Sequence, residues 1–162
     1  MATREETRQV MAGSVPIGGG APISVQSMTT ADTRDADAAI KQIRQLAAVG
    51  CEIVRVAVPD EEAADSLRSI RKASSVPLVA DIHFNYKLAL ASIEAGVDKL
   101  RINPGNIGGA DRVREGAHAA ADRGIPIRIG GNAGSPPADF GSKYCRTPEA
   151  LGGAALPHVR LL

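Results

Sequence analysis

Aromatic side chains are nearly absent from the sequence: they make up 2% of the residues, and none is tryptophan. The chain therefore has almost no aromatic side chains on which nucleic-acid bases could stack. A basic excess, which is typical of nucleic-acid-binding proteins, is also lacking, because 19 Lys and Arg stand against 18 Asp and Glu. We therefore expect no nucleic-acid partner.

Long apolar runs and a cysteine framework are lacking as well. No stretch approaches the roughly 20 apolar residues of a membrane span, and the first residues form no apolar core of a signal peptide. We expect no membrane partner and a cytoplasmic location.

Cys51 and Cys145 are too few for a disulfide framework and lack metal-site spacing, so no metal ligand is expected here. Cys51 is expected to be a small buried hydrophobe.

The sequence does contain strand-like and helical patterns that alternate about five times. Such alternation predicts an α/β fold of parallel strands with crossover helices. Two architectures fit: a doubly wound open sheet and a (β/α)8 TIM barrel, which needs about 250 residues and would be truncated here to about five β-α units. The expected strands are residues 23–28, 53–58, 76–81, 99–102 and 125–129, and the expected helices are 35–49, one from 60, 86–95 and 112–123.

Two simpler features accompany this alternation. The glycines at 18–20 precede the first expected strand, which favours a hairpin turn over a phosphate-binding loop. Arg44 and Arg71 lie on expected helices, where a solvated face is the default interpretation.

Polar side chains gather where the expected strands end. Residues two apart share a face of a strand, so Asp81 points the same way as His83, and Arg101 the same way as Asn103. In parallel α/β folds, ligands bind at the carboxyl ends of the strands. The full set of converging polar residues is Arg55, Asp81, His83, Arg101, Asn103, Arg128 and Asn132.

Three arginines in this set indicate an anion site, because a guanidinium binds phosphate oxygens through two parallel hydrogen bonds. Burying an arginine without a partner is costly, so each needs one. Arg55 could pair with Asp81, and Arg101 with a nearby acid, purely as scaffold. The repetition of the pattern on four strands favours a functional site.

The same segments resemble the 4-hydroxy-3-methylbut-2-enyl diphosphate synthases. The likeness runs from about Thr7 to Gly134 and continues more loosely toward Arg160. The motifs that carry it are VPIGGGAP at 15–22, VQSMTT at 25–30, VRVAVP at 54–59, ADIHF at 80–84, LRINPGN at 100–106, IRIG at 127–130 and NAG at 132–134.

The resemblance implies a TIM barrel followed by a smaller domain with a 4Fe–4S cluster, and a homodimer when full length. It implies an oxidoreductase of the methylerythritol phosphate pathway to isoprenoid and terpenoid precursors. The enzyme would reductively open 2-C-methylerythritol 2,4-cyclodiphosphate to 4-hydroxy-3-methylbut-2-enyl diphosphate. Reduced flavodoxin or ferredoxin, an electron-transfer partner, would supply two electrons.

On this basis residues 1–162 are expected to be a partial, substrate-binding TIM barrel without the cluster domain, and inactive alone. The seven polar residues match the family's substrate contacts, with Asp81 and His83 as the catalytic candidates that position a hydroxyl or move a proton. The cluster ligands would lie in the later domain. The alternative is a non-catalytic paralogue or another phosphate-binding barrel, similar to the pteroate synthases.

Overall fold

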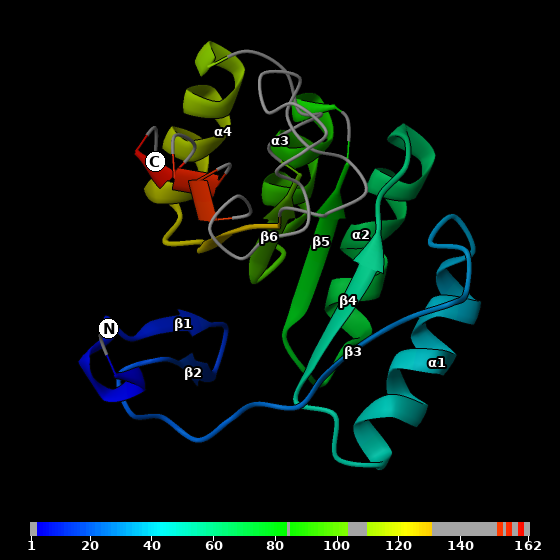
Figure 1. The fold of residues 1–162 in the computed structure, drawn as a ribbon. Coiled ribbons are helices and arrows are strands. Elements are labelled where there is room, and N and C mark those ends of the chain that lie inside the picture. Colours follow the sequence, from blue (N-terminus) through cyan, green and yellow to red (C-terminus); the bar gives the residue numbers. More distant parts are fainter. Residues whose placement is uncertain are drawn as a thin grey trace, which may run out of the picture.

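The computed structural model describes residues 3–83, 85–103 and 110–130, with short stretches at 152–153, 155–156 and 159–160. Its centre is a five-stranded parallel sheet in which the strands follow one another in chain order (Figure 1). The strands are β3 (Gln26–Met28), β4 (Ile53–Ala57), β5 (Leu78–Ile82), β6 (Lys99–Ile102) and β7 (Ile127–Ile129). The helices are α1 (Ala36–Ala48), α2 (Glu61–Ala73), α3 (Tyr86–Ala95) and α4 (Ala110–Asp122).

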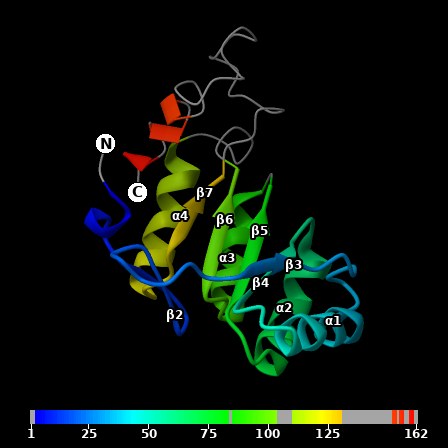
Figure 2. The same ribbon diagram turned by 60° about the horizontal axis from the view of Figure 1, so that its bottom comes forward.

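The consecutive strand order decides between the two expected architectures. A doubly wound sheet reverses its order at a switch point and carries helices on both faces. Here the order β3-β4-β5-β6-β7 never reverses, and the four helices lie along one side of the sheet (Figure 2). This is the arrangement of consecutive β-α units in a (β/α)8 barrel, so the barrel expectation is confirmed.

The sheet separates two apolar layers. On the helix side, alternate strand residues such as Val54, Val56, Ala80 and Leu100 form the main core with the helices. Cys51 belongs to this core and is buried, as expected from the sequence. On the opposite face Ile53 and Val79 pack against a hairpin of β1 (Val10–Ala12) and β2 (Val15–Ile17), which follows a short 3-10 helix at Arg4–Glu6.

The helices begin and end where their residues dictate. The side chains of Asp35 and Asp60 cap the N-termini of α1 and α2 by accepting hydrogen bonds from backbone N–H groups three residues on. Gly96 ends α3 with φ of +86°, a left-handed conformation in which glycine has no Cβ to clash.

Two expectations at the N-terminus were wrong in detail. The strand expected over 23–28 spans only Gln26–Met28, and Ile23 and Val25 before it are exposed. The hairpin turn lies at Gly13, with φ of +56°, between β1 and β2, and the glycines at 18–20 form a separate turn after β2. None of the helices in the described part of the chain is long and apolar enough to cross a membrane.

Candidate functional site

The polar strand-end residues lie on the sheet face opposite the helices. Ile53 and Val79 face the hairpin, and alternation then turns Arg55 and Asp81 toward the same side. The register places Asp81 beside Arg101, and Arg101 beside Arg128, on neighbouring strands. Because the strands are parallel and in register, one row of charged side chains crosses β5, β6 and β7.

Asp81 is the centre of this arrangement, with only 3% of its side chain exposed. Its Oδ1 accepts a hydrogen bond of 2.8 Å from Nη1 of Arg101. Its Oδ2 lies 3.5 Å from Nε of Arg55, and Oδ1 lies 3.3 Å from Nε2 of His83. These four residues, Arg55, Asp81, His83 and Arg101, are called the Asp81 cluster below.

Arg101 is fixed from two directions. While Nη1 donates to Asp81, Nη2 donates to the backbone carbonyl of Gly130 at 3.0 Å. The Arg101 side chain is only 7% exposed. A guanidinium held at both terminal nitrogens keeps one orientation, which is the preorganisation that an anion site requires.

His83 offers a group that can move a proton. Its Nε2 is 3.1 Å from Nη1 of Arg101 and 3.3 Å from Oδ1 of Asp81. When Nε2 carries no hydrogen it can accept from Arg101, and when it carries one it can donate to Asp81, so the two contacts suit different tautomers of the ring. The His83 side chain is 41% exposed, which leaves it accessible from the strand ends.

Arg55 differs from Arg101 in its environment. Its Nε faces both Asp81 and the sulfur of Met28, at 3.5 and 3.3 Å. The Arg55 side chain is 25% exposed, more than three times the fraction of Arg101. The cluster therefore combines one buried, immobilised guanidinium with one that reaches solvent.

The remaining expected site residues are distributed around the cluster. Arg128 is exposed on β7, in register with Arg101. Asn103 is buried directly after β6, and its N–H donates to the carbonyl of Ile82. Asn132 lies outside the described residues. The structure thus brings four of the seven together by direct contacts.

Sequence reasoning missed Lys99 and Gly130. Lys99 is half-buried at the start of β6, two residues before Arg101 and on the same face. Burial, and then the charge of Arg128, lowers its pKa from the usual 10.5. The alternation that selected Arg101 would also have selected Lys99. Gly130 ends the IRIG motif at 127–130, but the motif gave it no role, because that role depends on the approach of a side chain from another strand.

The strands of the site carry an excess of positive charge. Their charged residues are one carboxylate, Asp81, and four cations, Arg55, Lys99, Arg101 and Arg128. Asp81 can pair with only part of this positive charge, and an anionic ligand would accept charge-assisted hydrogen bonds from the cations that remain. The arrangement therefore favours binding of an anion with several oxygens.

A metal cluster does not fit this part of the chain. Among the described residues there is no group of three or more His, Cys, Asp or Glu that could hold a metal ion. Iron–sulfur clusters are held mainly by cysteine thiolates. The sequence has two cysteines, of which Cys51 is buried in the core on the helix side.

Comparison with known proteins places the fold and the site in context. The model of the GcpE TIM-barrel domain matches residues 7–162. The chain is 58% identical over 163 aligned positions to the 4-hydroxy-3-methylbut-2-en-1-yl diphosphate synthase (flavodoxin) of Maridesulfovibrio salexigens, covering 100% of this chain and 46% of that protein. The synthase of Symbiobacterium thermophilum is 55% identical, with 100% and 44% covered. The chain thus spans less than half the length of these relatives.

Solved structures agree on the fold. A protein of Burkholderia cenocepacia J2315 that carries the name phosphonomutase aligns with a TM-score of 0.57 at 17% identity, over 85% of this chain and 63% of that one. The GMP reductase of Trypanosoma brucei aligns with a TM-score of 0.50 at 20% identity, over 72% and 28%. At such identities the likeness concerns the fold alone.

Proposed function

Because the chain belongs to the GcpE TIM-barrel domain family, we propose that it is the substrate-binding part of a 4-hydroxy-3-methylbut-2-en-1-yl diphosphate synthase. Its relatives that carry this name match the whole chain at 55–58% identity. Such an enzyme is an oxidoreductase of isoprenoid precursor synthesis, and we propose 2-C-methylerythritol 2,4-cyclodiphosphate as the ligand of the site.

The observation that carries the proposal is the sharing of one carboxylate by several cations. Asp81 contacts both Arg55 and Arg101, so its single negative charge cannot neutralise both guanidinium groups. The surplus charge suits a diphosphate, whose oxygens accept charge-assisted hydrogen bonds from guanidinium groups. A neutral ligand would leave that surplus without compensation.

The proposed role of each site residue follows from how exposed its side chain is. Arg55 and Arg128 reach solvent and would be the first to contact the diphosphate. Arg101 would present its fixed guanidinium, with Asn103 and Asn132 as further hydrogen-bonding partners of the ligand. Asp81 and His83 would orient a hydroxyl group of the substrate and hold or move a proton at Nε2 of His83.

The electrons for a reductive ring opening would not come from this part of the chain. The described residues provide no ligand set for a 4Fe–4S cluster. The name of the relatives includes flavodoxin, which supports an electron-transfer protein as a partner of the whole enzyme. The contribution of this chain is confined to binding and proton movement.

Isothermal titration calorimetry with three ligands tests the proposal without any reductant. We expect the cyclic diphosphate to bind, inorganic pyrophosphate to bind more weakly, and neutral 2-C-methylerythritol to bind undetectably. The affinity for the cyclic diphosphate should fall as salt is added, since it depends on charge. Absence of binding, or equal binding of the neutral polyol, would contradict the proposal.

A genomic observation separates the synthase from a non-catalytic paralogue. The DNA beyond codon 162 is read in all frames. A continuing barrel followed by three cysteines, two of them closely spaced, is the result that the synthase predicts. An authentic stop codon directly after Leu162 would favour the paralogue.

A further inference from the structure

Gly130 lies where the Arg101 guanidinium meets the end of β7. Its carbonyl accepts the 3.0 Å hydrogen bond from Nη2 of Arg101. Its own N–H donates to the carbonyl of Ile102, at 2.9 Å. Gly130 is buried, so both of its backbone polar groups are used for fixing neighbours on β6.

A side chain at position 130 has no room. A Cβ atom added to Gly130 would lie 2.3 Å from Nε of Arg101 and 2.9 Å from Cζ and Nη2. Real Cβ atoms do not approach other heavy atoms this closely, so the guanidinium would have to move. By contrast, a Cβ at Gly116 in α4 would meet nothing within 4 Å.

The need for glycine here is steric and does not come from the backbone conformation. Gly130 is not among the glycines with positive φ, whereas Gly13, Gly50, Gly96 and Gly124 are. An alanine could therefore adopt the backbone of residue 130 without strain. What an alanine would disturb is the position of Arg101.

We infer that Gly130 is a positioning residue of the site, which sets the orientation of Arg101 toward Asp81 and the anion. The inference rests on the proposed function for the identity of that anion. The carbonyl of Gly130 and the carboxylate of Asp81 hold the two terminal nitrogens of one guanidinium, at 3.0 and 2.8 Å. If the guanidinium is displaced from the Gly130 carbonyl, its other terminal nitrogen also turns away from Asp81.

The first test observes Arg101 without any ligand. The side-chain ¹⁵N–¹H signal of Arg101 Nε is assigned by its disappearance in Arg101→Lys. We expect Gly130→Ala to shift this signal and speed its exchange with water, while Gly116→Ala leaves it in place. An unchanged Arg101 signal in a folded Gly130→Ala protein would overturn the inference.

The second test measures affinity for the cyclic diphosphate. We expect Gly130→Ala to weaken binding about tenfold or more, in line with loss of a charge-assisted hydrogen bond, and Gly116→Ala to leave it unchanged. In an Arg101→Lys background, Gly130→Ala should have little further effect, because no guanidinium remains to be displaced. A merely structural role would give the same loss in both backgrounds.

The two tests separate this inference from the proposed function. If Gly130→Ala moves Arg101 but the parent protein does not bind the cyclic diphosphate, the proposed ligand is wrong and the positioning role stands. If the parent binds the ligand and Gly130→Ala binds it equally well with an unmoved Arg101, the proposed function stands and the positioning role is wrong.

Discussion

Pairing of Asp81 with arginine does not by itself separate a scaffold from a binding site. The sequence raised both interpretations, and the structure contains the pairs that a scaffold would need. The count of charges is what distinguishes them, since Arg55 and Arg101 share one carboxylate and no second acid lies on the strands of the site. Arg55, which is 25% exposed and shares its carboxylate with Arg101, can therefore also bind an anion.

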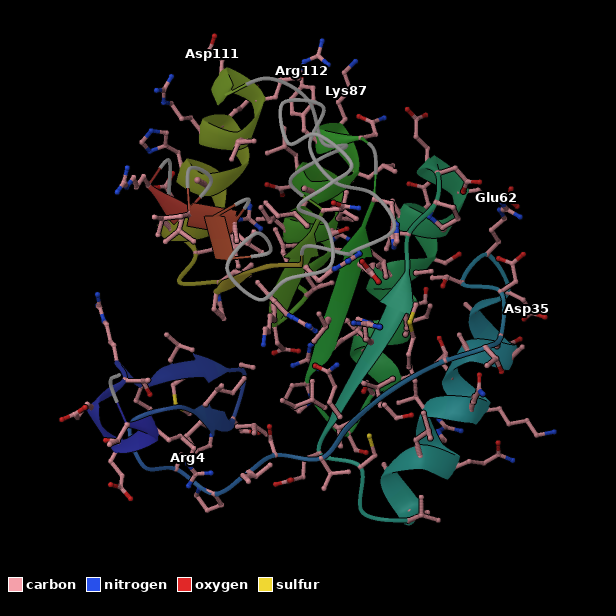
Figure 3. All side chains as sticks on the ribbon, viewed as in Figure 1. Arg4, Asp35, Glu62, Lys87, Asp111 and Arg112 are labelled. Carbon is pink, nitrogen blue, oxygen red and sulfur yellow. The ribbon has the colours of Figure 1, made fainter. Side chains whose placement is uncertain are left out.

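Replacing Asp81 should therefore destabilise the fold. Asp81→Asn leaves Arg101, 7% exposed, without its counter-charge. Loss of one member of a buried ion pair costs about 3–5 kcal/mol, so we expect a decrease of that size in the free energy of unfolding measured with urea. Asp111→Asn is the control, because Asp111 points away from the molecule (Figure 3) and is 98% exposed beside Arg114, and such surface pairs contribute about 0–1 kcal/mol. Equal effects of the two substitutions would contradict the central place of Asp81.

Alternation along strands was enough to select Arg55, Asp81 and Arg101 from the sequence. It depends only on the period of two, which the backbone enforces. The contact of Arg101 with Gly130 joins residues 29 positions apart, and it forms only because β6 and β7 lie side by side. No local pattern encodes such a contact, so the sequence could not reveal it.

At the scale of single elements, helix ends were the most predictable features. Asp60 was expected to open α2, and it caps the helix by accepting from the N–H of Ala63. The short β1–β2 hairpin was not predicted because each of its strands has only three residues. The glycines at 18–20 suggested a hairpin turn there, whereas the turn lies at Gly13. Strands this short give too few alternations to recognise.

Arg71 shows how packing can overturn an expectation about a helix face. The sequence suggested a solvated side chain, but Nη2 of Arg71 donates to Asp98 at 3.0 Å, and Nε lies 2.7 Å from the same carboxylate. Asp98 also accepts from the N–H of Leu78 at 2.8 Å. This contact ties α2 to the start of β5, so Arg71 is a structural residue and Arg44 on α1 is the better exposed control.

The cap of α2 predicts a specific dependence on pH. Hydrogen bonds from Arg34, and then from the N–H of Ala63, hold the pKa of Asp60 below its usual 3.8. The lowered pKa favours the ionised form in the folded protein, so its stabilisation is present above pH 3.8 and lost as pH falls through the folded-state pKa. Asp60→Asn keeps a capping oxygen but no charge.

We therefore expect the parent to be more stable than Asp60→Asn at pH 6, with the difference shrinking toward pH 3. Urea unfolding midpoints measured across this range test the expectation. Asp65→Asn, at an exposed position of the same helix, is the control and should show a smaller change. A difference between the parent and Asp60→Asn that is constant with pH would contradict the role of the Arg34 contact.

At the scale of the whole molecule, the strand order gives the fold its open edges. The five-stranded sheet ends at β3 and β7, so each has one side without a neighbouring strand among the described residues. Beside β3, Ile23 and Val25 expose 82% and 56% of their surface. Exposed strand edges with apolar neighbours pair readily with other chains.

The isolated chain should therefore self-associate. Sedimentation is expected to show species heavier than 16.8 kDa whose average mass rises with concentration. Val25→Lys should reduce this association, because a charge beside an edge strand disfavours pairing. Val49→Lys, at a more exposed position after α1, should not. A monomer at all concentrations, with a cooperative thermal transition, would contradict the open-edge account.

The most direct test of the account is the affinity of the site for 2-C-methylerythritol 2,4-cyclodiphosphate in Arg101→Lys, by calorimetry without reductant. Lysine keeps the positive charge. Its single ammonium group cannot bind Asp81 and the Gly130 carbonyl through two separate nitrogens, and it cannot offer a phosphate two parallel hydrogen bonds. We expect binding to weaken about ten- to a hundredfold, the equivalent of a charged hydrogen bond of about 1.5–3 kcal/mol. Arg44→Lys, on the exposed face of α1, should change it less than about twofold. If Arg101→Lys binds as tightly as the parent, Arg101 is scaffold and the Asp81 cluster is not the anion site.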